Sequence, residues 1–133
     1  YHILIEGEMS EPTGTLEDWV CKDERHRRMH TTQPETPGSK QARCNYRVLE
    51  RRSRASLVEV ELETGRKHQI RLQFGSRGYP VIGDRKYGST RPFSAGIALH
   101  AGRLALIHPV SGKPLEFTAL PPATWRAYGI RSE

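Results

Sequence analysis

This sequence of 133 residues has few cysteines and no long apolar run. Its two cysteines, Cys21 and Cys44, form no C-x-x-C pair, so we expect neither a disulfide framework nor a thiolate zinc site. A reducing cytoplasm is the simplest compartment for such a chain. No apolar stretch approaches the length of a membrane span, and no secretory signal is visible. We therefore expect a cytoplasmic protein with no membrane partner.

Hydrophobic and acidic residues are also in short supply. Hydrophobic residues make up 35% of the chain, and 15 Asp and Glu stand against 21 Lys and Arg, which gives a formal net charge of +6. The length fits one domain or part of a larger one, with a modest core. The basic balance favours a polyanionic partner such as RNA, DNA or an acidic membrane. A mildly basic protein with no nucleic-acid role would have the same composition.

Apolar residues follow a strand period in several places. Residues 57–63 alternate between apolar side chains and glutamates, which predicts a half-buried antiparallel strand with Val58, Val60 and Leu62 on its inner face. A polar turn at residues 51–54 joins this strand to another at 45–49, as in a β-hairpin. The pattern as a whole predicts an α+β fold, a mostly antiparallel mixed sheet with short flanking helices. The other expected elements are strands at 1–7, 97–107 and 115–118, a short turn or helix at 16–21, a helix over 70–74 and a final helix around 123–128.

The junction between the expected strand at 57–63 and the helix after it is dense in hydrogen-bond donors. Arg66, Lys67 and Arg71 fall within six residues, and such cations repel one another unless an anion lies near. A helix N-terminus adds partial positive charge. The junction therefore suits a phosphate or a carboxylate, although a solvated helix start would carry the same pattern.

Residues 22–54 hold a second concentration of positive charge, with ten of the 21 Lys and Arg residues. They fit either a surface that follows a phosphate backbone or a solvated charged face. His26 and His30 stand four residues apart in the same region. No third ligand follows at a useful spacing, so we expect no metal site.

Five segments carry motifs in a fixed order along the chain. Residues 64–71 read TGRKHQIR, residues 78–88 read GYPVIGDRKYG, and residues 99–101 read LHA. The other two are the HPVSGKPLEF segment at 108–117 and the strand from Tyr1 to Gly7. These segments resemble the TGRxHQIR, GxPIxGDxxYG, LHA, HPxTGExLxF and Y-x-A-x-V-x-G segments of the RluA/RluD-type RNA pseudouridine synthases. The first of the five is the most specific.

The resemblance implies an enzyme that isomerises uridine to pseudouridine in structured RNA, either ribosomal or transfer RNA, with no cofactor and no metal. In such enzymes a tyrosine packs on the flipped uridine, and an arginine holds the aspartate that starts cleavage of the glycosidic bond. The tyrosine position falls on Tyr1 and the arginine position on Arg71. A fixed guanidinium keeps a carboxylate ionised and aimed. The residues expected to contact the RNA are Arg66, Lys67, Arg27, Arg28, Arg51 and Arg52.

One family motif, the HRLDxxTSG segment that carries the aspartate, has no counterpart in this sequence. Residues 26–29 read HRRM without an aspartate, and Asp84 matches a different family position. The chain begins at Tyr1 inside a strand-like run. We therefore expect residues 1–133 to be the C-terminal part of a pseudouridine synthase catalytic domain, with the aspartate upstream of Tyr1. The alternative is a non-catalytic relative that binds RNA and modifies nothing.

Overall fold

The structure is a computed structural model that describes residues 1–52, 54–93, 96–107, 110–118 and 125. Most of the described elements are β-strands, joined by a short α-helix and a 3-10 turn. In chain order they are β1 (His2–Glu6), β2 (Thr13–Asp23), β3 (Arg28–Thr32), β4 (Lys40–Arg52), β5 (Ala55–Leu62), α1 (Gln69–Ser76), η1 (Arg85–Tyr87), β6 (Leu99–His100), β7 (Arg103–Ile107) and β8 (Pro114–Thr118).

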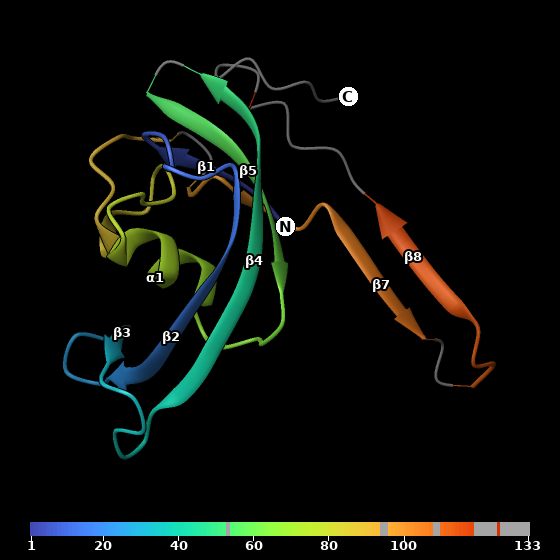
Figure 1. Ribbon diagram of the computed structural model, residues 1–133, viewed down its shortest axis with the longest axis horizontal. Helices are drawn as coiled ribbons and strands as arrows, with labels where there is room; N and C mark the ends of the chain where they lie inside the picture. The colour runs from blue at the N-terminus through green and yellow to red at the C-terminus, as the bar shows by residue number, and fades with distance from the viewer. Residues whose placement is uncertain (53, 94–95, 108–109, 119–124, 126–133) are drawn as a thin grey trace.

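Six of the strands form one curled sheet in the order β3-β2-β4-β5-β1-β6, and every neighbouring pair is antiparallel. Figure 1 shows α1 lying within the curve of this sheet, where it contacts β2, β3 and η1. Strands β7 and β8 pair with each other as a separate hairpin, which stands away from the sheet in Figure 1. The expected α+β fold with a mostly antiparallel sheet is confirmed.

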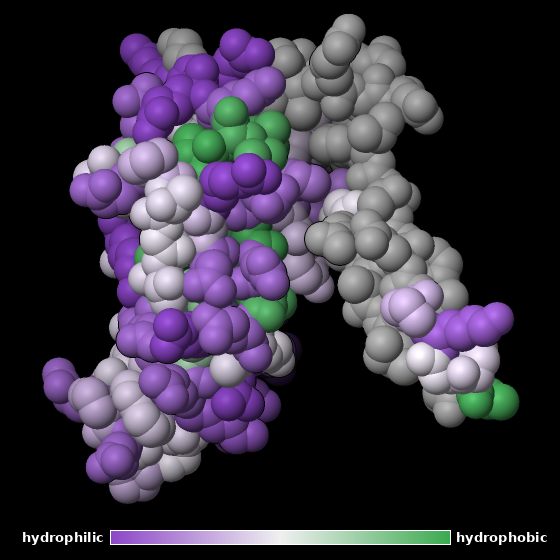
Figure 2. All heavy atoms as spheres, turned by 45° about the vertical axis from the view of Figure 1, so that its right-hand side comes forward, coloured by the Kyte–Doolittle hydropathy of each residue, from purple (hydrophilic) through white to green (hydrophobic). Residues whose placement is uncertain are grey.

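The hairpin of β4 and β5 turns the alternating sequence into a sheet with two different faces. Tyr46 lies opposite Val60 on the inner face, and these residues are only 9% and 2% exposed. The next pair along, Arg47 and Glu59, lies on the outer face and forms an ion pair of 3.3 Å. In Figure 2 the coloured surface of the sheet is mostly hydrophilic, with a few hydrophobic patches between. The alternation predicted for residues 57–63 therefore holds, although Leu62 is only partly buried.

Residues 16–21, expected to form a short turn or helix, are instead part of strand β2. Leu16 and Val20 are both buried, and their spacing of four residues fits one face of a strand as well as one face of a helix. Thr15 Oγ1 donates a 2.7 Å hydrogen bond to Asn45 Oδ1 on β4 rather than capping a helix. The prediction was wrong because pairing of β2 with β3 and β4 outweighs the local preference.

The expected strands and turns shift at their ends. The strand expected at 45–49 is the centre of the longer β4, so the turn after it shrinks to the two residues between Arg52 and Ala55. The strand expected over 97–107 is two strands, because β6 pairs with β1 and β7 pairs with β8. The strand expected at 115–118 is confirmed as β8.

The two expected helices have different outcomes. The helix predicted over 70–74 is confirmed as α1, which also takes in Gln69 and continues to Ser76. The helix expected around 123–128 lies outside the described residues, except for Trp125. That residue is 1% exposed and belongs to the core cluster beneath β1 and β5.

Two buried glutamines, Gln69 and Gln73, fix α1 to the sheet. Gln73 is fully buried, and its Nε2 donates to the main-chain oxygens of Leu16 and Ala42 at 3.2 and 3.3 Å. Its Oε1 accepts a 3.1 Å hydrogen bond from Gln69 Nε2. Buried amides need such partners. The start of α1 is therefore held at a set position against β2 and β4, which matters because functional side chains lie there.

Candidate active site

A small cavity of about 170 Å³ lies where β1, β5 and β6 meet the start of α1. Tyr1 extends β1 into this cavity: its main-chain nitrogen donates to Val60 O at 2.9 Å, and its side chain is 39% exposed. Arg71, on the first turn of α1, lines the same space. We call this space the Tyr1–Arg71 cavity. Its lining residues are Tyr1, Leu62, Arg66, His68, Gln69, Ile70, Arg71 and Leu99.

The loop that leads from β5 into α1 is held by the side chain of Gln69. Gln69 Oε1 accepts a 3.0 Å hydrogen bond from the main-chain nitrogen of Arg66 and a 2.7 Å bond from Thr64 Oγ1. His68, the residue before the helix, has a φ of 54°. This left-handed conformation is uncommon for a residue other than glycine. The TGRKHQIR segment is therefore folded into a fixed loop that lines the cavity, and is not merely a solvated helix start.

Arg71 is bound by a carboxylate from within the chain. Its Nε donates to Asp84 Oδ2 at 2.8 Å and its Nη2 to Asp84 Oδ1 at 2.9 Å. The Asp84 side chain is only 1% exposed, against 21% for Arg71. The hydrogen bonds that Arg71 donates to Asp84 raise the pKa of the Arg71 guanidinium. Two-point pairing of this kind fixes the plane of the guanidinium.

This pairing changes the interpretation of Arg71, which the sequence assigned to an aspartate outside the chain. A guanidinium carries five N–H donors. Asp84 takes two of them, so three remain for another acceptor. Asp84 does not take the place of the aspartate expected in the cavity. Both of its oxygens already accept hydrogen bonds from Arg71, and it does not line the Tyr1–Arg71 cavity. Asp84 is therefore a support for Arg71, and the role of Arg71 toward an upstream aspartate stays a prediction.

Tyr87 connects the cavity to the edge of the sheet. Its hydroxyl lies 2.8 Å from His68 Nδ1 and accepts a 2.9 Å hydrogen bond from the main-chain nitrogen of Met29 on β3. The guanidinium carbon of Arg71 lies 5.0 Å from the centre of the Tyr87 ring. Burial lowers the pKa of His68, and the nearby charge of Arg71 lowers it further. A neutral His68 can accept a hydrogen bond from the Tyr87 hydroxyl at Nδ1, and its Nε2–H can then donate a hydrogen bond to another group.

Sequence reasoning missed Asp84 and Tyr87 as functional residues. Both were part of a motif that the sequence displayed, GYPVIGDRKYG, but nothing in their local pattern says which side chains they meet. Asp84 closes an apolar run from Tyr79, and a lone acid at the end of such a run is the one available signal of a buried ion pair. The partner, 13 residues away on α1, becomes visible only in the fold.

Four of the six residues expected to contact RNA gather near this cavity. Arg66 lines it, and Lys67 follows directly in the same loop. Lys67 and Arg27 line a separate hollow of about 390 Å³ beside the turn between β2 and β3. Arg28 begins β3, with its guanidinium carbon 5.9 Å from the centre of the Tyr87 ring.

Arg51 and Arg52 lie apart from these four residues. Both stand at the end of β4, a strand of 13 residues whose first residue, Lys40, pairs with Val20 of β2. At about 3.3 Å per residue, roughly 40 Å of strand separates the two ends. Arg52 also forms an ion pair of 3.1 Å with Glu50. The structure therefore does not bring Arg51 and Arg52 together with the other predicted RNA contacts.

Metal and membrane sites were not expected from the sequence. Over the described ranges, no group of three or more His, Cys, Asp or Glu side chains is placed to hold a metal ion. His26, one of the two histidines weighed above, lies 2.7 Å from Asp23 Oδ2 in an exposed turn. None of the described helices has the length and apolar character needed to cross a membrane.

The fold defines the class of protein. The structure is similar to that of human RNA pseudouridylate synthase domain containing 1, with a TM-score of 0.77 and 26% sequence identity, over 91% of this chain and 53% of that one. Human RNA pseudouridylate synthase domain containing 4 shares the fold at a TM-score of 0.75 and 18% identity, over 98% of this chain and 61% of that one. The curled sheet with α1 in its curve is thus the fold of an RNA pseudouridylate synthase domain.

Sequence comparisons give the family. The sequence model of the RNA pseudouridylate synthase family matches residues 1–76. An uncharacterized RNA pseudouridine synthase of Chloroflexus aurantiacus is 43% identical over 126 residues, which cover 92% of this chain and 38% of the relative. Ribosomal large subunit pseudouridine synthase D of Zymomonas mobilis is 39% identical over 92 residues, which cover 62% of this chain and 29% of the relative. The chain belongs to the RNA pseudouridine synthase family, and it spans less than half the length of these curated relatives.

Proposed function

We propose that the full protein isomerises uridine to pseudouridine in structured RNA, either ribosomal or transfer RNA, in the cytoplasm. One observation carries the proposal: Tyr1 and Arg71, from segments 70 residues apart, line a single cavity. Membership of a family of isomerases supports it, as does a relative whose name specifies the large ribosomal subunit.

The residues of the Tyr1–Arg71 cavity have distinct parts in this proposal. The flipped base packs on the ring of Tyr1, since an enzyme that acts on a base must take it out of the stack. Leu62, Ile70 and Leu99 supply apolar walls for the base. At about 170 Å³ the cavity is smaller than the ~300–1,000 Å³ pockets that hold drug-sized ligands. It therefore suits a single base.

The remaining donors of Arg71 have a part of their own. We propose that they hold the carboxylate of an aspartate that precedes Tyr1 in the full protein. Asp84 orients the guanidinium from behind through two hydrogen bonds. A charged donor held in this way keeps the incoming carboxylate ionised and aimed at the sugar. No cofactor is needed for this reaction.

A second candidate function is RNA binding without modification. It is favoured by one observation: none of the residues that line the Tyr1–Arg71 cavity in the described structure is an aspartate or a glutamate. The two candidates differ in a single measurable product, because only the enzyme replaces the C5 hydrogen of uridine with a bond to the ribose.

Release of tritium from RNA labelled at uridine C5 tests the proposal. We expect the full protein to release tritium from ribosomal or transfer RNA. Tyr1→Phe keeps the ring and should retain most of the rate. Tyr1→Ala removes a stacking contact worth about 1–3 kcal/mol, so its catalytic efficiency should fall about 5- to 150-fold. If the protein binds both RNAs but releases no tritium, the non-catalytic relative is favoured. Equal rates for Tyr1→Ala and wild type would refute the role of Tyr1.

A further inference from the structure

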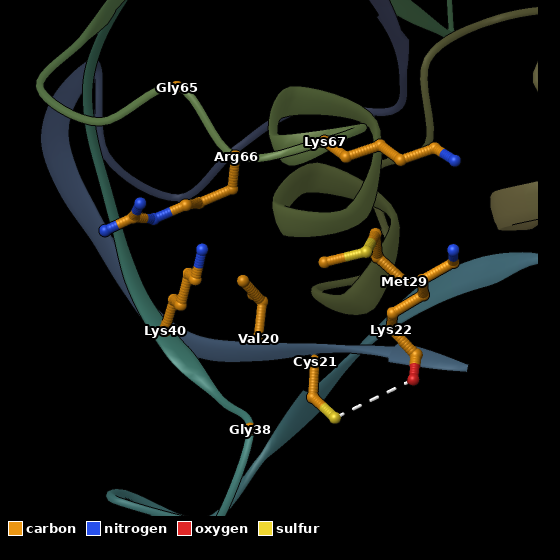
Figure 3. A pocket seen from close by; sticks show the side chains of 9 residues that line it. All are labelled: Val20, Cys21, Lys22, Met29, Gly38, Lys40, Gly65, Arg66 and Lys67. Carbon is orange, nitrogen blue, oxygen red and sulfur yellow. Dashed lines mark hydrogen bonds between the residues drawn. The ribbon is translucent and has the colours of Figure 1, made fainter. Parts of the chain in front are cut away.

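Three hollows in the surface share lining residues and so lie next to one another. Arg66 lines both the Tyr1–Arg71 cavity and a neighbouring hollow of about 310 Å³, which Figure 3 shows from close by. Lys22 and Lys67 line this second hollow and also the third, of about 390 Å³, beside the turn between β2 and β3. The three hollows therefore form a row from the cavity, past the loop before α1, to the end of the β2–β3 hairpin. We call it the basic track.

Positive side chains stand on both sides of the second hollow. In Figure 3, Arg66 and Lys40 lie on one side and Lys67 and Lys22 on the other. Its floor is apolar: between these pairs lie Val20, which is 2% exposed, and Met29, which is 9% exposed. The third hollow adds a fifth cation, Arg27, and one acid, Glu24.

The cations of the basic track are not neutralised within the described part of the chain. Arg66 donates through Nε to the main-chain oxygen of Gln41 at 2.8 Å, and no ion pair forms there at Arg66, Lys67, Lys22, Lys40 or Arg27. The sheet's outer face differs in this respect: Arg43 pairs with Glu17 at 2.7 Å and with Glu63 at 2.8 Å. Five close cations that outnumber the one acid beside them, and that form no ion pair among the described residues, repel one another. This repulsion is tolerable when an anion binds between them.

We propose that the basic track binds the phosphodiester backbone of the RNA strand on one side of the target uridine. The proposal rests on the proposed function, since it takes the Tyr1–Arg71 cavity as the place of the flipped base. A strand that leaves this cavity passes Arg66 first, then the pair Lys40 and Lys67, then Lys22 and Arg27. Phosphates contact the rim, while the apolar floor packs against ribose. A row of three neighbouring hollows fits an extended polyanion better than a single phosphate group.

Gly65 offers a way to block the track without changing its charge. It lines the second hollow, and a Cβ atom added to it would meet nothing within 4 Å. A side chain can therefore be added on the edge of the hollow with no clash at its Cβ atom. Gly75 is a contrasting case, because a Cβ there would lie 2.5 Å from the main-chain oxygen of Tyr87.

The test uses a single-stranded uridine 20-mer RNA and three variants of the full protein. Lys22→Gln with Lys40→Gln removes two charges from the track, and Arg51→Gln with Arg52→Gln removes two from the far end of β4. Each phosphate contact to a single strand contributes about 0.7 to the slope of log K against log salt. We expect the first double variant to lose about 1.4 of this slope and the matched control to keep the wild-type slope. Gly65→Leu should bind at least tenfold more weakly with an unchanged melting temperature.

Each other outcome contradicts the proposal in a recognisable way. Equal losses of slope in both double variants would mean that net charge attracts the RNA without a defined path. They would also support Arg51 and Arg52 as RNA contacts. If the Lys22→Gln, Lys40→Gln variant keeps the wild-type slope, the basic track does not bind the RNA backbone. Competition by polyglutamate as strong as that by RNA would indicate an acidic protein partner. Failure of the proposed function looks different, because the wild-type protein would release no tritium while the difference in slope remained.

Discussion

An Arg71→Lys protein is expected to fold normally and to form pseudouridine at least about 100-fold more slowly than wild type. A lysine can still neutralise Asp84 as a point charge, but it lacks the planar fork of the guanidinium. With the ammonium drawn to Asp84, which is 1% exposed, no fixed donor remains for the carboxylate expected in the Tyr1–Arg71 cavity. Loss of one preorganised donor in an active site typically costs about 10²–10³ in turnover. Tritium release at saturating RNA measures it.

Arg77 supplies the matched control for this prediction. It also pairs with an aspartate, at 2.8 Å from Asp18 Oδ2, but it does not line the cavity. Arg77→Lys should therefore leave turnover near the wild-type value. A wild-type rate for Arg71→Lys would show that the fork geometry has no part in the reaction, and would remove Arg71 from the catalytic residues.

The second large effect concerns stability: Arg71→Ala is expected to lower the free energy of unfolding by about 3–5 kcal/mol. The variant leaves the buried Asp84 carboxylate without its two hydrogen bonds from Arg71, and a buried charge that loses its ionic partner is costly. Adding Asp84→Ala removes the stranded charge, so the double variant should be more stable than Arg71→Ala alone. Chemical denaturation of the single and double variants measures both differences.

The comparison again uses the pair of Arg77 and Asp18, whose side chains are 30% and 16% exposed. Solvent screens a more exposed pair, so Arg77→Ala should cost only about 1 kcal/mol. The account of Asp84 fails if Arg71→Ala costs no more than Arg77→Ala. Inactivity of Arg71→Ala would therefore say little about catalysis, because the variant combines lost donors with a weakened fold. Arg71→Lys separates the two.

The sequence predicted those parts of the fold that depend on local periodicity. Strand β5, its hairpin with β4, and helix α1 followed from alternation or from helical spacing. Residues 16–21 did not, because buried side chains four residues apart fit either element and β2 is decided by its two neighbouring strands. The division of residues 97–107 between β6 and β7 also depends on which strands they pair with.

Two residues of the candidate site were expected from the sequence, but the side chains that they contact were not. The resemblance gave Tyr1 and Arg71, and the fold places both at one cavity. It could not give Asp84 as the partner of Arg71, because a salt bridge between a helix and a later turn leaves no local pattern. The concentration of positive charge in residues 22–54 also grouped Arg51 and Arg52 with Arg27 and Arg28, since position in the sequence does not show the length of β4.

A crystal structure of the full protein bound to uridine-containing RNA would test the central claim most directly. The account predicts a flipped pyrimidine in the Tyr1–Arg71 cavity, in van der Waals contact with the Tyr1 ring. It also predicts an aspartate from the segment before Tyr1 within about 3 Å of the free nitrogens of Arg71, with Asp84 still bound behind. A target base lodged elsewhere, with this cavity empty or closed, would contradict it.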